Sequence, residues 1–150
     1  MKEKYAPLVL RMGLALLFLW FGISQLVDPT LLMGYLPQWA STLPVPPATI
    51  ILLSSLFETI FGFLLLLGLF TRWAALLLFV HVLIIAFSLG YNDVAIRDFG
   101  IAVATFSLFL HGKDQWSMDT KVQSKLKNNI LAKLFYLFDA KESAPSESKN

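Results

Sequence analysis

Residues 50–70, with the sequence IILLSSLFETIFGFLLLLGLF, decide the fold of this chain, and Glu58 is the only charged residue among them. An α-helix rises about 1.5 Å per residue, so roughly 20 apolar residues cross the ~30 Å hydrocarbon core of a bilayer. A surface helix of a soluble protein would show a charged face, and this stretch has none. The stretch therefore predicts a transmembrane helix.

Three further apolar runs flank this stretch. Residues 8–27 read LVLRMGLALLFLWFGISQLV, residues 73–89 read WAALLLFVHVLIIAFSL, and residues 94–110 read VAIRDFGIAVATFSLFL. The chain is 57% apolar and only 15% charged, whereas a soluble domain carries about 25% charged residues. These features predict an all-α integral membrane four-helix bundle whose surroundings are the lipid bilayer.

The sequence contains no cysteine, which excludes disulfides, thiolate metal sites and thiol redox relays within the chain. The formal net charge is only +2, and the basic residues adjoin the apolar runs. That placement is typical of topology and lipid-headgroup signals rather than of a nucleic-acid surface. We therefore expect no nucleic-acid partner.

Lysine and arginine gather on one side of the four predicted crossings. The N-terminus, the joint at residues 71–72 and the region after residue 110 share this side, which holds Lys2, Lys4, Arg72, Lys113, Lys121, Lys125, Lys127 and Lys133. The joints on the other side, residues 28–49 and 90–93, contain neither residue type. The positive-inside rule then predicts a multi-pass protein of the cell membrane with both termini in the cytoplasm.

The chain divides into three predicted parts. Residues 1–119 form the four-helix domain, with the proline-rich loop 28–49 between its first two helices. The loop is apolar enough to lie over the outer mouth of the bundle as a lid or re-entrant segment. The alternative is a loop in the headgroup region, anchored by Tyr35 and Trp39.

Beyond the bundle, residues 120–139 place apolar side chains at helical spacing, with lysines largely on the other face. This pattern predicts an amphipathic helix on the anionic inner leaflet, and the alternative is a helix that packs on a partner subunit. Residues 140–150 have the composition of a disordered tail.

Polar side chains inside the apolar runs are the candidates for function, because a charge in hydrocarbon costs roughly 2.5–3.5 kcal/mol unless it is paired or hydrated. Glu58 lies near the predicted midplane and shares a helix face with Ser54 and Gly62. Because a glycine lets a neighbouring helix approach closely, this face is expected to point into the bundle.

The first and fourth runs supply possible neighbours of Glu58. One face of the first run holds Arg11, Ala15, Phe18, Gly22 and Gln25. One face of the fourth run holds Arg97, Gly100, Ala104, Ser107 and His111, with Asp98, Ala102 and Thr105 beside it. We predict a polar cluster of Glu58, Arg97, Asp98 and Gln25 in the outer half, with Arg97 as a partner of Glu58. It is either an ion-pair network that fixes helix register or a ligand or proton site.

His81 lies in the middle of the third run. It is either a hydrogen-bonded structural histidine or a contact for a quinone or a proton. A bis-histidine haem would need a second imidazole at the depth of His81. The other histidine, His111, lies at the cytoplasmic end of the fourth run, roughly 13 Å away in depth. We expect no metal site and no covalently bound cofactor, and no catalytic residue is assigned.

Several segments resemble DoxX-family membrane proteins. RMGLALLFLWFGISQL is similar to the first helix of that family, and FETIFGFLLLLGLFTRWAALLL is similar to its second helix, basic joint and third helix. AIRDFGIAVATFSLFLHG, followed by WSMD, is similar to its last helix and trailing motif. The resemblance covers residues 8–119, and the order and spacing of the segments carry it.

The resemblance implies a four-helix bundle linked to quinone-dependent redox chemistry, because relatives include the small subunit of thiosulfate:quinone oxidoreductase. It implies that Arg11, Glu58, Arg97 and Asp98 correspond to the polar positions of the family. Gln25 differs, because many members have a basic residue at that position. A redox partner subunit, in the membrane or the cytoplasm, and a homo-oligomer would fit such a protein. The alternative is a non-enzymatic carrier of a small molecule or lipid, or an assembly factor for a membrane complex.

Overall fold

A computed structural model describes residues 2–36, 40, 42–112 and 114–119 of the chain. Within these residues the structure has no strand, and its elements are α1 (Lys2–Val27), the 3-10 helix η1 (Pro29–Tyr35), α2 (Pro47–Leu67), α3 (Thr71–Ser88) and α4 (Asp93–His111). All four α-helices are long and apolar enough to cross a membrane. The predicted amphipathic helix over residues 120–139 and the predicted tail lie outside the described residues.

The helix boundaries differ from the predicted runs because apolar composition marks the hydrocarbon and not the helix ends. α1 begins at Lys2 rather than at residue 8. α2 begins at Pro47, which suits the first turn of a helix because that position needs no backbone N–H. The same helix stops before residue 70 because Gly68 adopts the left-handed conformation (φ 67°) and its N–H bonds back to the carbonyls of Leu64 and Leu65.

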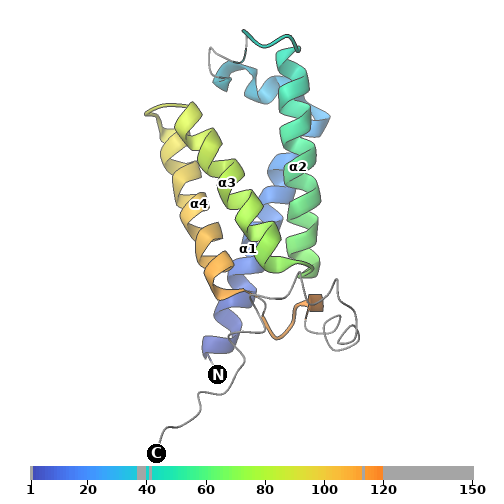
Figure 1. Ribbon diagram of the computed structural model, residues 1–150, viewed down its shortest axis with the longest axis vertical. Helices are drawn as coiled ribbons and strands as arrows, with labels where there is room; N and C mark the ends of the chain where they lie inside the picture. Colours follow the sequence, from blue (N-terminus) through green and yellow to red (C-terminus); the bar gives the residue numbers. More distant parts are fainter. Residues whose placement is uncertain (1, 37–39, 41, 113, 120–150) are drawn as a thin grey trace, which may run out of the picture.

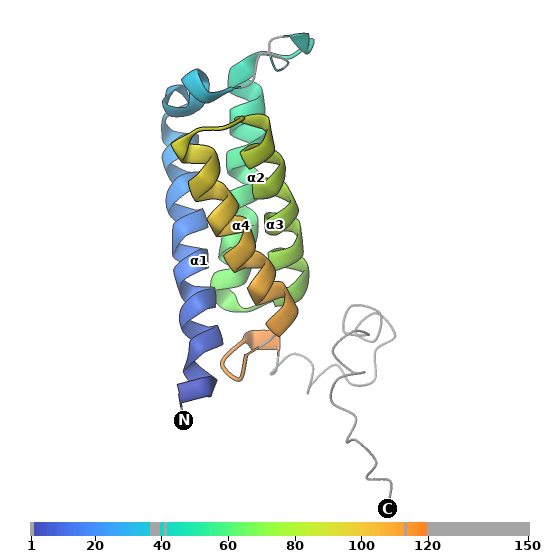
Figure 2. The same ribbon diagram turned by 90° about the vertical axis from the view of Figure 1, so that its left-hand side faces the viewer.

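The bundle is built from two antiparallel helix pairs, α1 with α2 and α3 with α4. Contacts within each pair are far more extensive than contacts between the pairs. Figure 1 shows α2 diverging from α3 and α4 toward the top of the view, and Figure 2 shows the same helices from the side. We call the top the loop end, because it holds η1 and the turn between α3 and α4, and the bottom the terminal end, because it holds the N-terminus.

The α1–α2 pair is close because glycines remove side chains from the contact. A Cβ added at Gly22 would stand 2.9 Å from the backbone of Ser55 and Thr59, and one at Gly62 would stand 3.1 Å from the Cβ of Phe18. The predicted inner face of α1 is buried along its whole length, namely at Arg11, Ala15, Phe18, Gly22 and Gln25. The sequence prediction for this helix is thus confirmed.

The predicted inner face of α4 was wrong by one position. The residues that pack into the bundle are Ala95, Asp98, Ala102, Thr105 and Leu108. Arg97, Gly100, Ser107 and His111 are exposed instead. The buried face carries small side chains at Ala95 and Ala102, which let a neighbouring helix approach more closely than the long Arg97 side chain would.

A short strap, residues 114–119, closes the terminal end. The Arg11 side chain donates to Asp114 at 2.6 Å and to the carbonyls of Leu65 and Leu66 at 2.6 and 2.9 Å. Asp119 accepts from the backbone N–H groups of Phe70 and Thr71 at 2.7 and 2.8 Å. Because these N–H groups begin α3, Asp119 caps that helix from a distance in sequence, and the strap ties the two helix pairs together.

Candidate functional site: a cavity between the helix pairs

A cavity of about 450 Å³ separates the two helix pairs in the half of the bundle nearer the loop end. Ligand pockets in proteins span roughly 300–1,000 Å³, so the cavity has the size of a small-molecule site. Its walls are mostly apolar side chains from all four helices, with Leu32, Tyr35 and Leu36 contributed by the segment around η1.

The η1 segment forms because its sequence carries the signals of a helix start. Asp28 accepts a hydrogen bond from the Thr30 N–H at 3.0 Å, and Pro29 occupies the first helical position. The segment packs on α1 and α2 and faces the cavity. Of the two interpretations of the loop, the structure favours the lid, and Trp39 lies outside the described residues.

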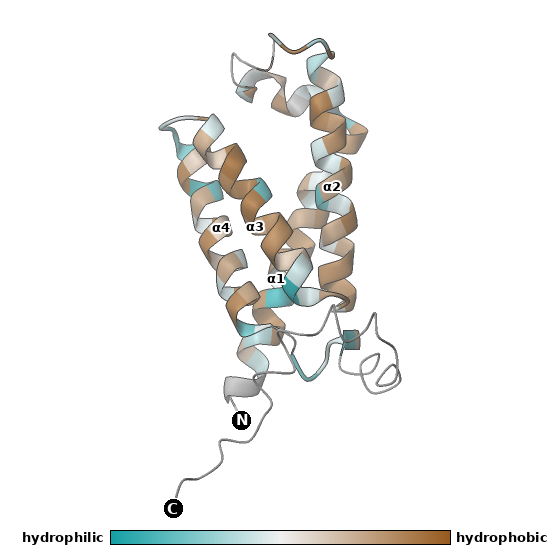
Figure 3. Ribbon diagram, viewed as in Figure 1, coloured by the Kyte–Doolittle hydropathy of each residue, from teal (hydrophilic) through white to brown (hydrophobic). Residues whose placement is uncertain are grey.

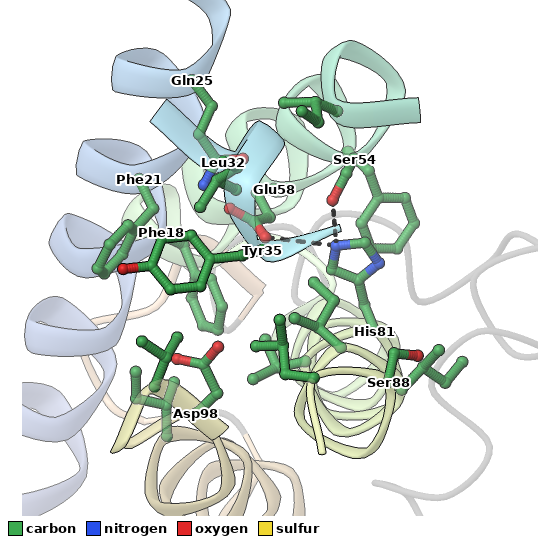
Figure 4. Close-up of a pocket in the computed structure, with 18 of the residues that line it drawn as sticks. Phe18, Phe21, Gln25, Leu32, Tyr35, Ser54, Glu58, His81, Ser88 and Asp98 are labelled. Atoms are coloured by element: carbon green, nitrogen blue, oxygen red, sulfur yellow. Dashed lines mark hydrogen bonds and ion pairs between the residues drawn. The ribbon is translucent and has the colours of Figure 1, made fainter. Parts of the chain in front are cut away.

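The central polar group of the cavity is formed by Glu58 and His81, from α2 and α3. His81 Nε2 lies 3.3 Å from Glu58 Oε1 and 3.0 Å from Ser54 Oγ (Figure 4). The Glu58 side chain is only 7% exposed and the His81 side chain 22%. Figure 3 shows that α2 and α3 are mainly hydrophobic helices. A carboxyl group and an imidazole therefore meet at a largely buried position.

Phe57 contacts this pair, and a hydrogen bond between α1 and α2 lies nearby. The Phe57 ring lies against the His81 ring, with centroids 4.7 Å apart, and limits its rotation. Ser55 lies one position after Ser54, and its hydroxyl is 2.9 Å from Gln25 Oε1 and 2.6 Å from the Ile51 carbonyl. Gln25 thus links α1 to α2 beside the cavity that it also lines.

Arg97 and Asp98 form a second charged group, on α4. The Arg97 guanidinium lies 2.9 Å from Asp98 Oδ1 through both Nε and Nη2. It also lies over the Phe21 ring, 4.9 Å from the centroid, so it connects α4 to α1. The Asp98 side chain is 12% exposed and the Arg97 side chain 48%, so the carboxylate lies inside while the guanidinium reaches the rim.

All five residues predicted from the sequence as site candidates, Glu58, Arg97, Asp98, Gln25 and His81, line this one cavity. The expected pairing is corrected, however, because Glu58 contacts His81 while Arg97 contacts Asp98. The reason is the helix arrangement, since α3 and not α4 lies opposite Glu58. Whether these residues bind a ligand stays a prediction.

Sequence reasoning missed the lining contribution of Tyr35 and the contact of Ser54 with His81. A signal for the second was present, because Ser54 shares a helix face with Glu58 and His81 is the one polar residue at mid-depth of its run. Among the described residues, no group of three or more His, Cys, Asp or Glu side chains could hold a metal ion.

Comparison with known proteins places this geometry in a family. The DoxX family model matches residues 6–90, which is more than half of the chain. The match spans α1, η1, α2 and α3, and so includes Gln25, Glu58 and His81, but it stops before Arg97, Asp98 and the strap. No curated protein and no solved structure matches the chain.

Proposed function

Because the chain belongs to the DoxX family of membrane proteins, we propose that it binds a quinone between its helix pairs and acts as the quinone-binding subunit of a redox system. One observation carries this proposal, namely the buried contact between Glu58 and His81. It lies in a mostly apolar cavity that is large enough for a quinone ring. A buried carboxyl–imidazole pair beside a cavity is an arrangement typical of proton transfer.

The cavity suits a planar, weakly polar ring with a carbonyl at each end. Phe18, Phe21 and Leu17 offer apolar and aromatic surface for the ring faces. Groups that could donate to the ring oxygens lie at two places. In the centre, the Ser54–His81–Glu58 group would exchange one of its internal hydrogen bonds for a bond to the ligand, and the Arg97 guanidinium lines the rim. A ligand of this class would then be held by stacking and oriented by two hydrogen bonds.

The Glu58–His81 pair can hold a proton in either of two neutral arrangements. One has an ionised carboxylate beside an imidazolium, and the other has a carboxylic acid beside a neutral imidazole. In both the net charge is zero, which suits a site within hydrocarbon. Glu58 and His81 would supply one proton to a bound quinone oxygen on reduction and take it back on oxidation. The second proton that the quinol requires would reach its other oxygen from water at the rim of the cavity.

Reduction of a quinone to a quinol also requires two electrons, and a thiol relay within this chain is ruled out because it has no cysteine. The electrons would therefore come from a redox partner subunit. A non-enzymatic carrier would need no proton-exchanging pair beside the ring, and this is why the Glu58–His81 contact favours the redox role over the carrier.

The test uses the purified protein in a mild detergent with added quinone in an electrochemical cell, so that no partner is needed. Extraction measures bound quinone, and redox-induced infrared difference spectroscopy follows carboxyl groups that change protonation or hydrogen bonding. We expect saturable binding and a carboxyl signal in wild type that disappears in Glu58→Gln. The matched control is Asp93→Asn, an exposed carboxyl at the start of α4, which should keep the signal.

Absence of saturable quinone binding would contradict the proposal outright. Binding that is retained in wild type and in Glu58→Gln, with identical infrared spectra, would instead favour the carrier. Loss of the signal in Asp93→Asn as well would mean that the signal reports global change and not the Glu58 carboxyl.

A further inference from the structure

The wall of the cavity is incomplete between α2 and α3. Leu53 of α2 and Ile84 of α3 both line the cavity, yet they are 64% and 59% exposed. A side chain that lines a cavity while most of its surface is exposed stands at the mouth of that cavity. The mouth therefore lies on the lateral surface of the bundle, between α2 and α3. Figure 1 shows that these two helices diverge toward the loop end.

The depth of this mouth places it in hydrocarbon and not in water. Leu53 lies six residues from the start of α2 and Ile84 four residues from the end of α3, which corresponds to about 9 Å and 6 Å of helix rise. Half of the hydrocarbon core is about 15 Å thick. Both residues thus fall within the leaflet at the loop end, while Leu32, Tyr35 and Leu36 cover the cavity on the side of the headgroups.

Polarity increases from the mouth inward. Ser54 follows Leu53 directly, and His81 lies one helical turn from Ile84. The Ser54 and His81 side chains contact each other (Figure 4). Glu58, the most buried of the three residues, contacts His81 on the side away from the mouth. A ligand entering through the mouth would therefore pass apolar side chains first and meet hydrogen-bonding groups only inside.

From this order we propose that the gap between α2 and α3 is a lateral portal for an amphipathic ligand from the bilayer. The ligand has a polar ring that reaches His81 and Glu58 and a long apolar tail that stays in the portal and the surrounding lipid. The inference rests on the proposed quinone site for the identity of the ring, and it adds the tail and the route. A water-soluble ligand has no comparable reason to enter through an apolar mouth in hydrocarbon.

The experiment compares two quinones with the same ring, one with an isoprenoid tail and one with a methyl group instead. Association is measured by stopped-flow with the protein in liposomes. The portal is narrowed in Leu53→Trp/Ile84→Trp and widened in Leu53→Ala/Ile84→Ala. The matched control is Leu56→Trp/Phe87→Trp, on the same helices and exposed but outside the cavity lining.

We expect wild type to bind the tailed quinone more tightly than the methyl quinone. The narrowed variant should slow association of the tailed quinone by about tenfold, which corresponds to roughly 1.4 kcal/mol in the barrier, while the widened variant should not slow it. The control should match wild type, and equal thermal unfolding midpoints for the variants would exclude misfolding as the cause.

The remaining outcomes contradict the portal, the tail or the quinone site separately. If wild type binds both quinones and neither the narrowed nor the widened variant changes the association rates, the portal is wrong while quinone binding stands. If the methyl quinone binds as tightly and as fast as the tailed one, the proposed tail is wrong. If neither quinone binds, the proposed function fails and the portal fails with it.

Discussion

Substitution of Asp114 by asparagine is the sharpest test of how the bundle is held at its terminal end. Arg11 and Asp114 are 3% and 1% exposed at their side chains, and their charged atoms lie 2.6 Å apart. Removal of one partner of a buried ion pair costs about 3–5 kcal/mol, because the other charge is left uncompensated. Arg11 would keep its bonds to the Leu65 and Leu66 carbonyls, so we expect the lower end of that range, about 3 kcal/mol.

The assay is the free energy of unfolding in mixed micelles, titrated with SDS and followed by tryptophan fluorescence. Gln115→Ala is the matched control, because Gln115 is exposed within the same strap, and its unfolding free energy should stay within about 0.5 kcal/mol of wild type. The double variant Arg11→Met/Asp114→Leu should be less destabilised than Asp114→Asn, since it removes both charges together.

An unfolding free energy of Asp114→Asn within about 0.5 kcal/mol of wild type would refute this reasoning. It would mean that the Arg11–Asp114 ion pair contributes nothing to holding the two helix pairs together.

Two further predictions follow from the helix contacts and the charge pattern. Gly22→Ala should lower the unfolding free energy by about 1–2 kcal/mol, because its Cβ would meet the backbone of α2. Gly13→Ala, with no atom within 4 Å of its Cβ, should raise it by about 0.5–1 kcal/mol; the same sign for both would contradict the close α1–α2 contact. A single cysteine at Tyr91, at the loop end, should react with an impermeant maleimide in intact cells, whereas one at Gln115 should react only after permeabilisation. The reverse labelling would overturn the predicted orientation.

The sequence predicts the helices well because hydrocarbon imposes a length and an apolar composition on them. It also predicts the inner face of α1, since Arg11 and Gln25 cannot face lipid without a penalty and therefore fix the rotation of the helix. α3 offers no comparable signal, because apolar residues surround the helix between its ends and only His81 interrupts residues 73–87.

The pairing within the site could not be predicted because it depends on which helices are neighbours. Arg97 is the partner of Glu58 that the sequence predicts, and only the packing of α2 against α3 in the structure places His81 opposite Glu58. The strap was missed for a different reason. Asp119 caps α3 through hydrogen bonds to residues nearly fifty positions earlier in the chain. A local sequence pattern cannot predict a contact between residues so far apart in the sequence.

The two ends of the bundle differ in how closely the helix pairs are connected. At the terminal end, the Arg11–Asp114 ion pair and the Asp119 cap connect the helix pairs. At the loop end the pairs diverge around the cavity, and His81 reaches across it to Ser54, Phe57 and Glu58 while Arg97 reaches Phe21. A bundle that is tied at one end and open at the other can admit a ligand laterally without separating its helices.

Photolabelling with a tailed azidoquinone tests the central claim most directly, because it reports where the ring lies. The account predicts saturable labelling of peptides that contain Ser54–Glu58 or His81–Ile85, with competition by unlabelled tailed quinone. Labelling should fall strongly in Glu58→Gln/His81→Ala and remain in the control Asp93→Asn. Labelling that is not saturable, or that falls only on lipid-exposed positions such as Phe87, would contradict a quinone site between the helix pairs.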